Sequence, residues 1–101
     1  FIIMIDNVVA AKGFNAVGSK SRLIVLTELV KVGSNGLTIG EIQELVNIPL
    51  STLAHHLGHL KKANLIHQEK KGRSTYNFAQ FNHIQQLTDY LLNECCVNER
   101  K

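Results

Sequence analysis

Basic side chains are concentrated in one short stretch of the sequence. Residues 61–73 contain five of the eleven Lys and Arg residues and one acid, Glu69. Because the whole chain carries only +3, the residues outside this stretch sum to about −1. A confined positive patch of this kind is typical of proteins that bind phosphate groups, so we predict contacts to a nucleic-acid backbone. The basic residues are Lys61, Lys62, Lys70, Lys71 and Arg73.

The basic stretch directly follows a helix-length segment. At 100° per residue, its leucines, Leu50, Leu53, Leu57 and Leu60, fall on one stripe. The opposite side carries small hydrogen-bonding and basic side chains, which can contact base edges in the major groove. These candidate DNA-binding residues are Ser51, Thr52, His55, His59 and Lys62, with His56 on the flank.

Three earlier helices are expected to support this segment. Apolar residues at helical spacing predict a first helix at about residues 2–14 and a second one that contains Leu23, Leu26, Thr27 and Val30. A capping box between Thr38 and Glu41 predicts the start of a third helix, which ends near residue 46. The short turn 47–49 then joins the third helix to the fourth as a helix-turn-helix.

The segments after the fourth helix predict a β-hairpin and a last helix. Residues 65–69 and 74–78 have the composition of short strands, and Gly72 supplies the positive φ of a tight turn between them. Apolar residues from Phe81 to Cys95 predict a fifth helix at about 81–97. The expected fold class is mainly α with a small β-hairpin, a winged helix-turn-helix, in one domain that covers residues 1–101.

Several of these segments, in this order, resemble the signature of the ArsR/SmtB repressors. They are residues 21–23, 51–57, 60–66 and 71–73, together with Tyr76. Asn64 stands where that family usually has glycine, and asparagine tolerates the same left-handed backbone. The resemblance covers about residues 19–96. It implies a homodimer formed by the first and last helices, an inverted-repeat operator in double-stranded DNA, and release of DNA when an inducer binds.

Cys95 and Cys96 are the candidate inducer site. Together with Asn93 and Glu94 they resemble a subgroup of ArsR repressors that binds trivalent arsenic through an adjacent cysteine pair, and soft thiolates suit such an ion. The familiar cysteine site in the third helix and the zinc site on the last helix are both missing. Three alternatives remain: a structural pair in which Cys95 is a buried hydrophobe, a sensor of redox state or reactive sulfur, and no ligand at all. His55, His56 and His59 could also be taken as a metal cluster, although no local carboxylate or thiol accompanies them.

Other functional classes find little support in the sequence. It contains no glycine-rich phosphate loop, no paired carboxylates and no nucleophile beside a base, so we predict that the chain is not an enzyme and requires no cofactor. The longest hydrophobic run is far shorter than a membrane span, and the expected location is the cytoplasm. A winged helix that contacts a protein instead of DNA remains the alternative from a different class.

Overall fold

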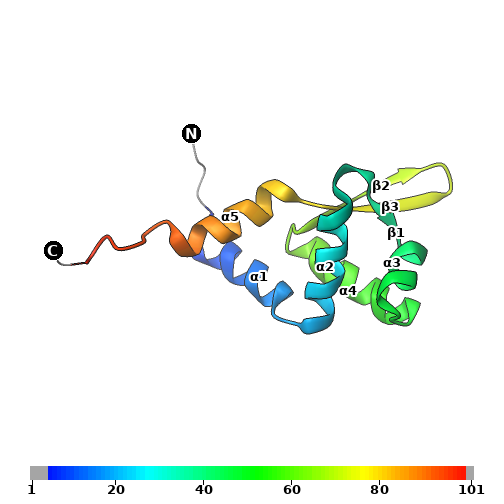
Figure 1. Ribbon diagram of the computed structural model, residues 1–101, viewed down its shortest axis with the longest axis horizontal. Helices are drawn as coiled ribbons and strands as arrows, with labels where there is room; N and C mark the ends of the chain where they lie inside the picture. Colours follow the sequence, from blue (N-terminus) through cyan, green and yellow to red (C-terminus); the bar gives the residue numbers. More distant parts are fainter. Residues whose placement is uncertain (1–4, 100–101) are drawn as a thin grey trace.

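Five α-helices and three short strands follow one another along residues 5–99, the part of the 101-residue chain that the computed structural model describes (Figure 1). The helices are α1 (Asn7–Val17), α2 (Lys20–Val32), α3 (Ile39–Val46), α4 (Leu50–Lys62) and α5 (Phe81–Leu92). The strands are β1 (Leu37–Thr38), β2 (Ile66–Lys71) and β3 (Ser74–Ala79), and a 3-10 turn (Gly33–Asn35) precedes β1. This arrangement confirms the predicted winged helix-turn-helix.

Local sequence signals determine where the helices begin and end. The Thr38 side chain accepts a hydrogen bond from the Glu41 backbone N–H, and the Glu41 carboxylate accepts one from the Thr38 N–H, which confirms the predicted capping box. Asn47 ends α3 in the left-handed conformation, with φ of 54°. Asn64 adopts the same conformation after α4, with φ of 61°. Asparagine tolerates this backbone better than most residues, so the chain turns sharply at both positions.

The sheet contains one strand more than the sequence predicted. β3 lies in the middle and pairs antiparallel with both β1 and β2. The buried Asn77 side chain connects all three strands, because it donates to the Leu37 carbonyl at 3.1 Å and accepts from the Gln68 amide at 2.8 Å. These bonds tie the base of the hairpin to the strand that precedes α3. The hairpin projects from the end of the molecule that holds α3, and α1 and the end of α5 lie at the opposite end (Figure 1).

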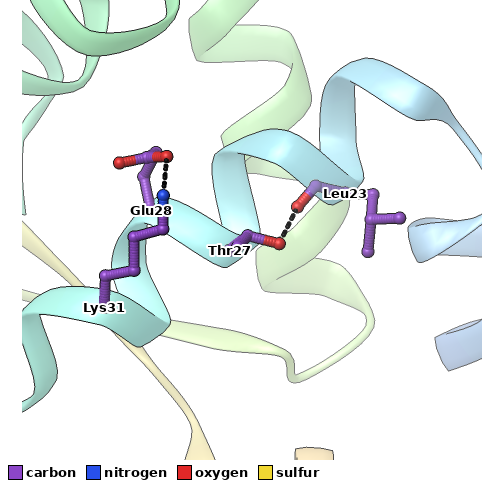
Figure 2. A network of polar contacts seen from close by, with 4 residues as sticks. All are labelled: Leu23, Thr27, Glu28 and Lys31. Carbon is purple, nitrogen blue, oxygen red and sulfur yellow. Dashed lines mark hydrogen bonds and ion pairs between the residues drawn. The ribbon is translucent and has the colours of Figure 1, made fainter.

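The predicted apolar face of α2 is wrong except for Leu26. Leu23, Thr27 and Val30 are exposed, and the Thr27 hydroxyl donates to the Leu23 carbonyl at 2.8 Å on the outer side of the helix (Figure 2). The residues of α2 that enter the core are Val25, Leu26 and Leu29. They pack in one cluster with the buried leucines of α4, which are Leu53, Leu57 and Leu60.

The first and last helices pack side by side at the end of the molecule that is distant from the hairpin (Figure 1). They approach closely at Gly13, where a Cβ atom would lie 2.6 Å from the buried Leu87 side chain. Both helices differ in length from the prediction: α1 runs from Asn7 to Val17 instead of 2–14, and α5 ends at Leu92 instead of 97. Residues 2–4 of the predicted first helix lie outside the described residues. Within residues 5–99, no helix is long and apolar enough to cross a bilayer.

Candidate nucleic-acid interface

Helix α4 presents its polar side to solvent as predicted. Ser51, Thr52 and His55 are exposed, while Leu53 on the opposite side is completely buried. The buried leucines fix the rotation of the helix about its axis, because any other rotation would expose them to water. The three polar side chains nearest the start of α4 are therefore free to contact a ligand.

The hairpin of β2, the turn Gly72–Arg73 and β3, called the wing here, carries the other predicted contacts. Lys70 pairs with Thr75 and Lys71 with Ser74, and Gly72 in the turn has φ of 63° as predicted. Lys70, Lys71 and Arg73 are all exposed. The Lys71 ammonium lies 5.3 Å from the centre of the Tyr76 ring and 5.4 Å from that of Phe78, so these rings hold its positive charge at the wing surface.

Helix α4 and the wing border a common groove of about 550 Å³. Ala54 and Leu57 line it from α4, and Arg73, Ser74 and Thr75 line it from the wing. The cationic turn therefore lies next to the side of α4 that carries Ala54.

Comparison with known proteins agrees with this geometry. A family described as a helix-turn-helix domain matches residues 17–69, just over half of the chain. The uncharacterized HTH-type transcriptional regulator MJ1325 of Methanocaldococcus jannaschii is 38% identical over 69 residues, which is 68% of this chain and 73% of that protein. The transcriptional repressor SdpR of Bacillus subtilis is 32% identical over 80 residues, or 79% of this chain and 86% of the repressor.

This chain belongs to the helix-turn-helix transcriptional regulators. Among solved structures, the ArsR family transcriptional regulator RHA00566 superposes with a TM-score of 0.79 at 17% identity, over 98% of this chain and all of that one. The homodimeric winged helix-turn-helix DNA-binding domain Mb0332 of Mycobacterium bovis superposes with a TM-score of 0.68 at 18% identity, over 92% of this chain and 86% of that one. The regulator thus has the winged-helix fold of ArsR-family proteins and is not an enzyme.

Two predicted contacts of the regulator lie apart from the wing. His59 and Lys62 line a second groove, of about 660 Å³, between α4 and α1, together with Lys12 and Asn15. Lys62 brings a positive charge of α4 close to α1. Ser51, Thr52 and His55 thus lie in the first half of α4, whereas His59 and Lys62 lie in its second half.

His56 is the most enclosed of the predicted contacts. It is half-buried, and its Nδ1 atom has no hydrogen-bond partner among residues 5–99. Burial, and then the positive charge of Arg22, lower the pKa of His56, so this imidazole is neutral at pH 7. Arg22 itself donates to the carbonyls of Ala16 and Asn15 at the end of α1. Sequence spacing placed His56 on the flank of α4 but gave no sign of this guanidinium.

The cysteine pair of the regulator lies beyond the last helix. Cys95 and Cys96 are both exposed, so the alternative in which Cys95 is a buried hydrophobe is wrong for the described chain. Their Sγ atoms are 3.2 Å apart. Hydrogen bonds with Cys95 and with Glu99 raise the pKa of the Cys96 thiol. Among residues 5–99, no group of three or more His, Cys, Asp or Glu side chains is arranged to hold a metal ion.

Gly58 is an exposed glycine in the interior of α4. A Cβ atom at this position would meet nothing within 4 Å. Glycine in a helix interior costs about 1 kcal/mol relative to alanine. We expect Gly58→Ala to raise the stability of the regulator by about 1 kcal/mol and its Tm by roughly 4–8 °C in a thermal unfolding experiment. A fall in Tm would show that the fold itself requires glycine there. DNA affinity measured on the same variant reports whether the duplex approaches the helix backbone at this residue.

Proposed function

We propose that this regulator is a dimeric, sequence-specific DNA-binding repressor that a thiophilic inducer releases from its operator. The observation that supports DNA binding most strongly is the exposure of Ser51, Thr52 and His55 on α4 and of Lys70, Lys71 and Arg73 on the wing, two elements that border one groove. The similarity to the transcriptional repressor SdpR, which extends over 86% of that protein, supports the same function.

The contacts divide into two classes with different consequences. Ser51, Thr52 and His55 stand on the first turns of α4, which in helix-turn-helix proteins meet base edges in the major groove. The basic side chains bind phosphates, and the guanidinium of Arg73 suits the negative potential of a narrow minor groove. We assign phosphate contacts to Lys62, Lys70, Lys71 and Arg73, and place His56 and His59 beside the duplex.

Dimerisation is supported by apolar side chains on the two helices at the end of the molecule distant from the wing. Val8 of α1 is 65% exposed, and Leu91 and Leu92 of α5 are 68% and 70% exposed. A second copy that covers these side chains removes them from water and presents two α4 helices to two half-sites about 34–36 Å apart. The operator is then an inverted repeat. The homodimeric state of the Mycobacterium bovis domain supports this arrangement.

Alanine variants of the two classes separate sequence recognition from phosphate binding. We expect Ser51→Ala, Thr52→Ala and His55→Ala each to reduce the preference for the operator over unrelated DNA by about 1–3 kcal/mol, because a contact to one base edge is lost. Lys62→Ala should weaken binding to all duplexes alike. Fluorescence anisotropy on operator and scrambled duplexes, at several salt concentrations, measures both effects. Binding that is insensitive to salt and to all four substitutions would favour a protein-interaction module.

The exposed cysteine pair supports the inducer part of the proposal. Two Sγ atoms 3.2 Å apart can bind one As(III) centre, and the chemistry balances: arsenous acid and two thiols give a dithiolate-bound As–OH and two waters. The pair follows α5, which belongs to the proposed dimer interface. Ligation there changes how the two subunits meet, and a small rotation between them is enough to move the α4 helices out of register.

Release of DNA by thiol ligands tests this part directly. We expect arsenite and phenylarsine oxide to dissociate the native regulator from its operator at near-stoichiometric concentrations, whereas Cys95→Ser and Cys96→Ser lower the sensitivity at least tenfold and leave operator affinity unchanged. Zinc and hydrogen peroxide serve as comparison ligands. If peroxide alone dissociates the complex, the pair senses redox state, and if no thiol-directed ligand acts, the cysteines have no inducer role.

A further inference from the structure

Leu50 is exposed where the sequence predicted a buried residue. It is the first residue of α4, directly after Pro49, and 47% of its surface is accessible, whereas the other leucines of the predicted stripe are buried. No preceding helical turn covers it, because Pro49 has φ of −54° and ψ of 143° and directs the chain away from the helix. A large apolar side chain therefore stands beside the exposed Ser51 and Thr52.

Leu50 begins an uncharged edge along α4. Residues four apart lie on one face of a helix, so Leu50, Ala54 and Gly58 form a row, and all three are exposed. Ala54 also lines the groove between α4 and the wing, which places this row on the side of α4 that faces the wing. Side-chain size decreases along the row from leucine to glycine. The only member long enough to reach far from the helix is therefore the one on the first turn.

We propose that Leu50 determines part of the sequence specificity by packing against the 5-methyl group of a thymine in each half-site. The major groove displays this methyl group as its one apolar feature, and apolar side chains are the groups that recognise it. Leu50 has the largest apolar side chain of the three, whereas Ser51 and Thr52 carry hydroxyls that suit hydrogen bonds to neighbouring base edges. The inference rests on the proposed DNA-binding function and adds a residue that hydrogen-bonding arguments omit.

The chain contains a matched control for this proposal. Leu45 of α3 is 56% exposed, which is comparable to Leu50, but it does not belong to the first turn of α4. A general apolar contribution to binding or stability would affect Leu45→Ala and Leu50→Ala alike. A specific contact with the thymine methyl group is lost only in Leu50→Ala. Leu50→Met, which keeps an apolar side chain of similar length, is a second control.

The experiment compares thymine with deoxyuracil, which lacks only the 5-methyl group. After the operator is selected from random duplexes with the native protein, each thymine is replaced in turn, and Kd is measured by fluorescence anisotropy. We expect one symmetric replacement to weaken native binding about 3–5-fold per half-site, as the loss of one buried methyl group requires. Leu50→Ala should bind the thymine and deoxyuracil operators equally. Leu45→Ala and Leu50→Met should keep the native difference.

Two results would overturn the proposal. In one, no deoxyuracil replacement changes the Kd of the native protein. In the other, Leu50→Ala still discriminates between thymine and deoxyuracil at the sensitive position as the native protein does. Circular dichroism on each variant establishes that it is folded before binding is measured. If selection with the native protein enriches no sequence, the proposed repressor function fails instead, so the two failures are distinguishable.

Discussion

Replacing Lys71 and Arg73 together with glutamine should reduce DNA affinity roughly 10³- to 10⁴-fold at ~0.1 M salt, with little dependence on sequence. The proposed dimer, with two wings, loses four of the proposed phosphate contacts, and each contact contributes about one order of magnitude through release of counterions. The slope of log Kd against log salt concentration should fall by about 3–4 for the same reason. Affinity measured between 50 and 300 mM salt gives both quantities.

Lys31→Gln is the control for the loss of charge alone. Lys31 lies on α2, and its ammonium is 2.9 Å from the Glu28 carboxylate, so its charge is already paired within the protein (Figure 2). We expect this variant to bind DNA within about twofold of the native protein, because an exposed pair of this kind contributes little. Equal losses per charge removed by the α2 and wing variants would mean that net charge, and not the position of the wing, determines affinity.

Gly36→Ala should destabilise the fold by about 3 kcal/mol, the largest stability effect expected for a single methyl group in this chain. Gly36 has φ of 66° and ψ of 173°, a conformation that is almost confined to glycine. A Cβ atom there would also lie 2.5 Å from the ring of Phe78, which is buried in β3. The ring supports the sheet and cannot move away freely. Thermal or urea denaturation should show a Tm lower by roughly 10–20 °C.

Gly72→Ala separates the two causes of this loss. Gly72 has a similar φ of 63°, but a Cβ atom at the tip of the wing would meet nothing within 4 Å. The cost at Gly72 should therefore be limited to backbone strain, about 1 kcal/mol. If the two variants lose the same stability, contact with Phe78 is not the cause of the larger effect at Gly36.

Helix boundaries were predictable from the sequence wherever a specific residue enforces them. Thr38 and Glu41 form a capping box that depends only on their spacing, and Asn47 and Asn64 adopt left-handed conformations that few other side chains tolerate. The turn of the wing follows from Gly72 in the same way. These signals are local, so tertiary contacts were not needed to identify them.

The predictions fail where the sequence contains no local signal for an element, its end or its buried face, or contains several conflicting signals. Helix α2 has apolar residues on several sides, so its periodicity does not identify the face that enters the core. β1 has two residues, and only its pairing with β3 makes it a strand. Helix α5 stops at Leu92 although neither glycine nor proline follows. Of these errors, the end of α5 has the greatest effect on the candidate site, because it places Cys95 and Cys96 outside the helix.

The exposure of the residues of the proposed DNA-binding surface was partly predictable, but their surroundings were not. Exposure of Ser51, Thr52 and His55 follows from the leucines on the opposite side of α4. The exposure of Leu50 depends on the direction of the chain at Pro49, and the pKa of His56 is lowered by burial and by the charge of Arg22, which is distant in sequence. Such long-range contacts are decided by tertiary packing and leave no periodic pattern.

The bond between Asn77 and Leu37 joins residues 40 positions apart. During synthesis, all of α3 and α4 leaves the ribosome before β3 is available to complete the sheet. A nascent chain that stops after Lys62 contains the helix-turn-helix but has no partner for β1, and its wing does not exist. The proposed DNA-binding surface requires both α4 and the wing, so it is complete only after residue 79 has emerged.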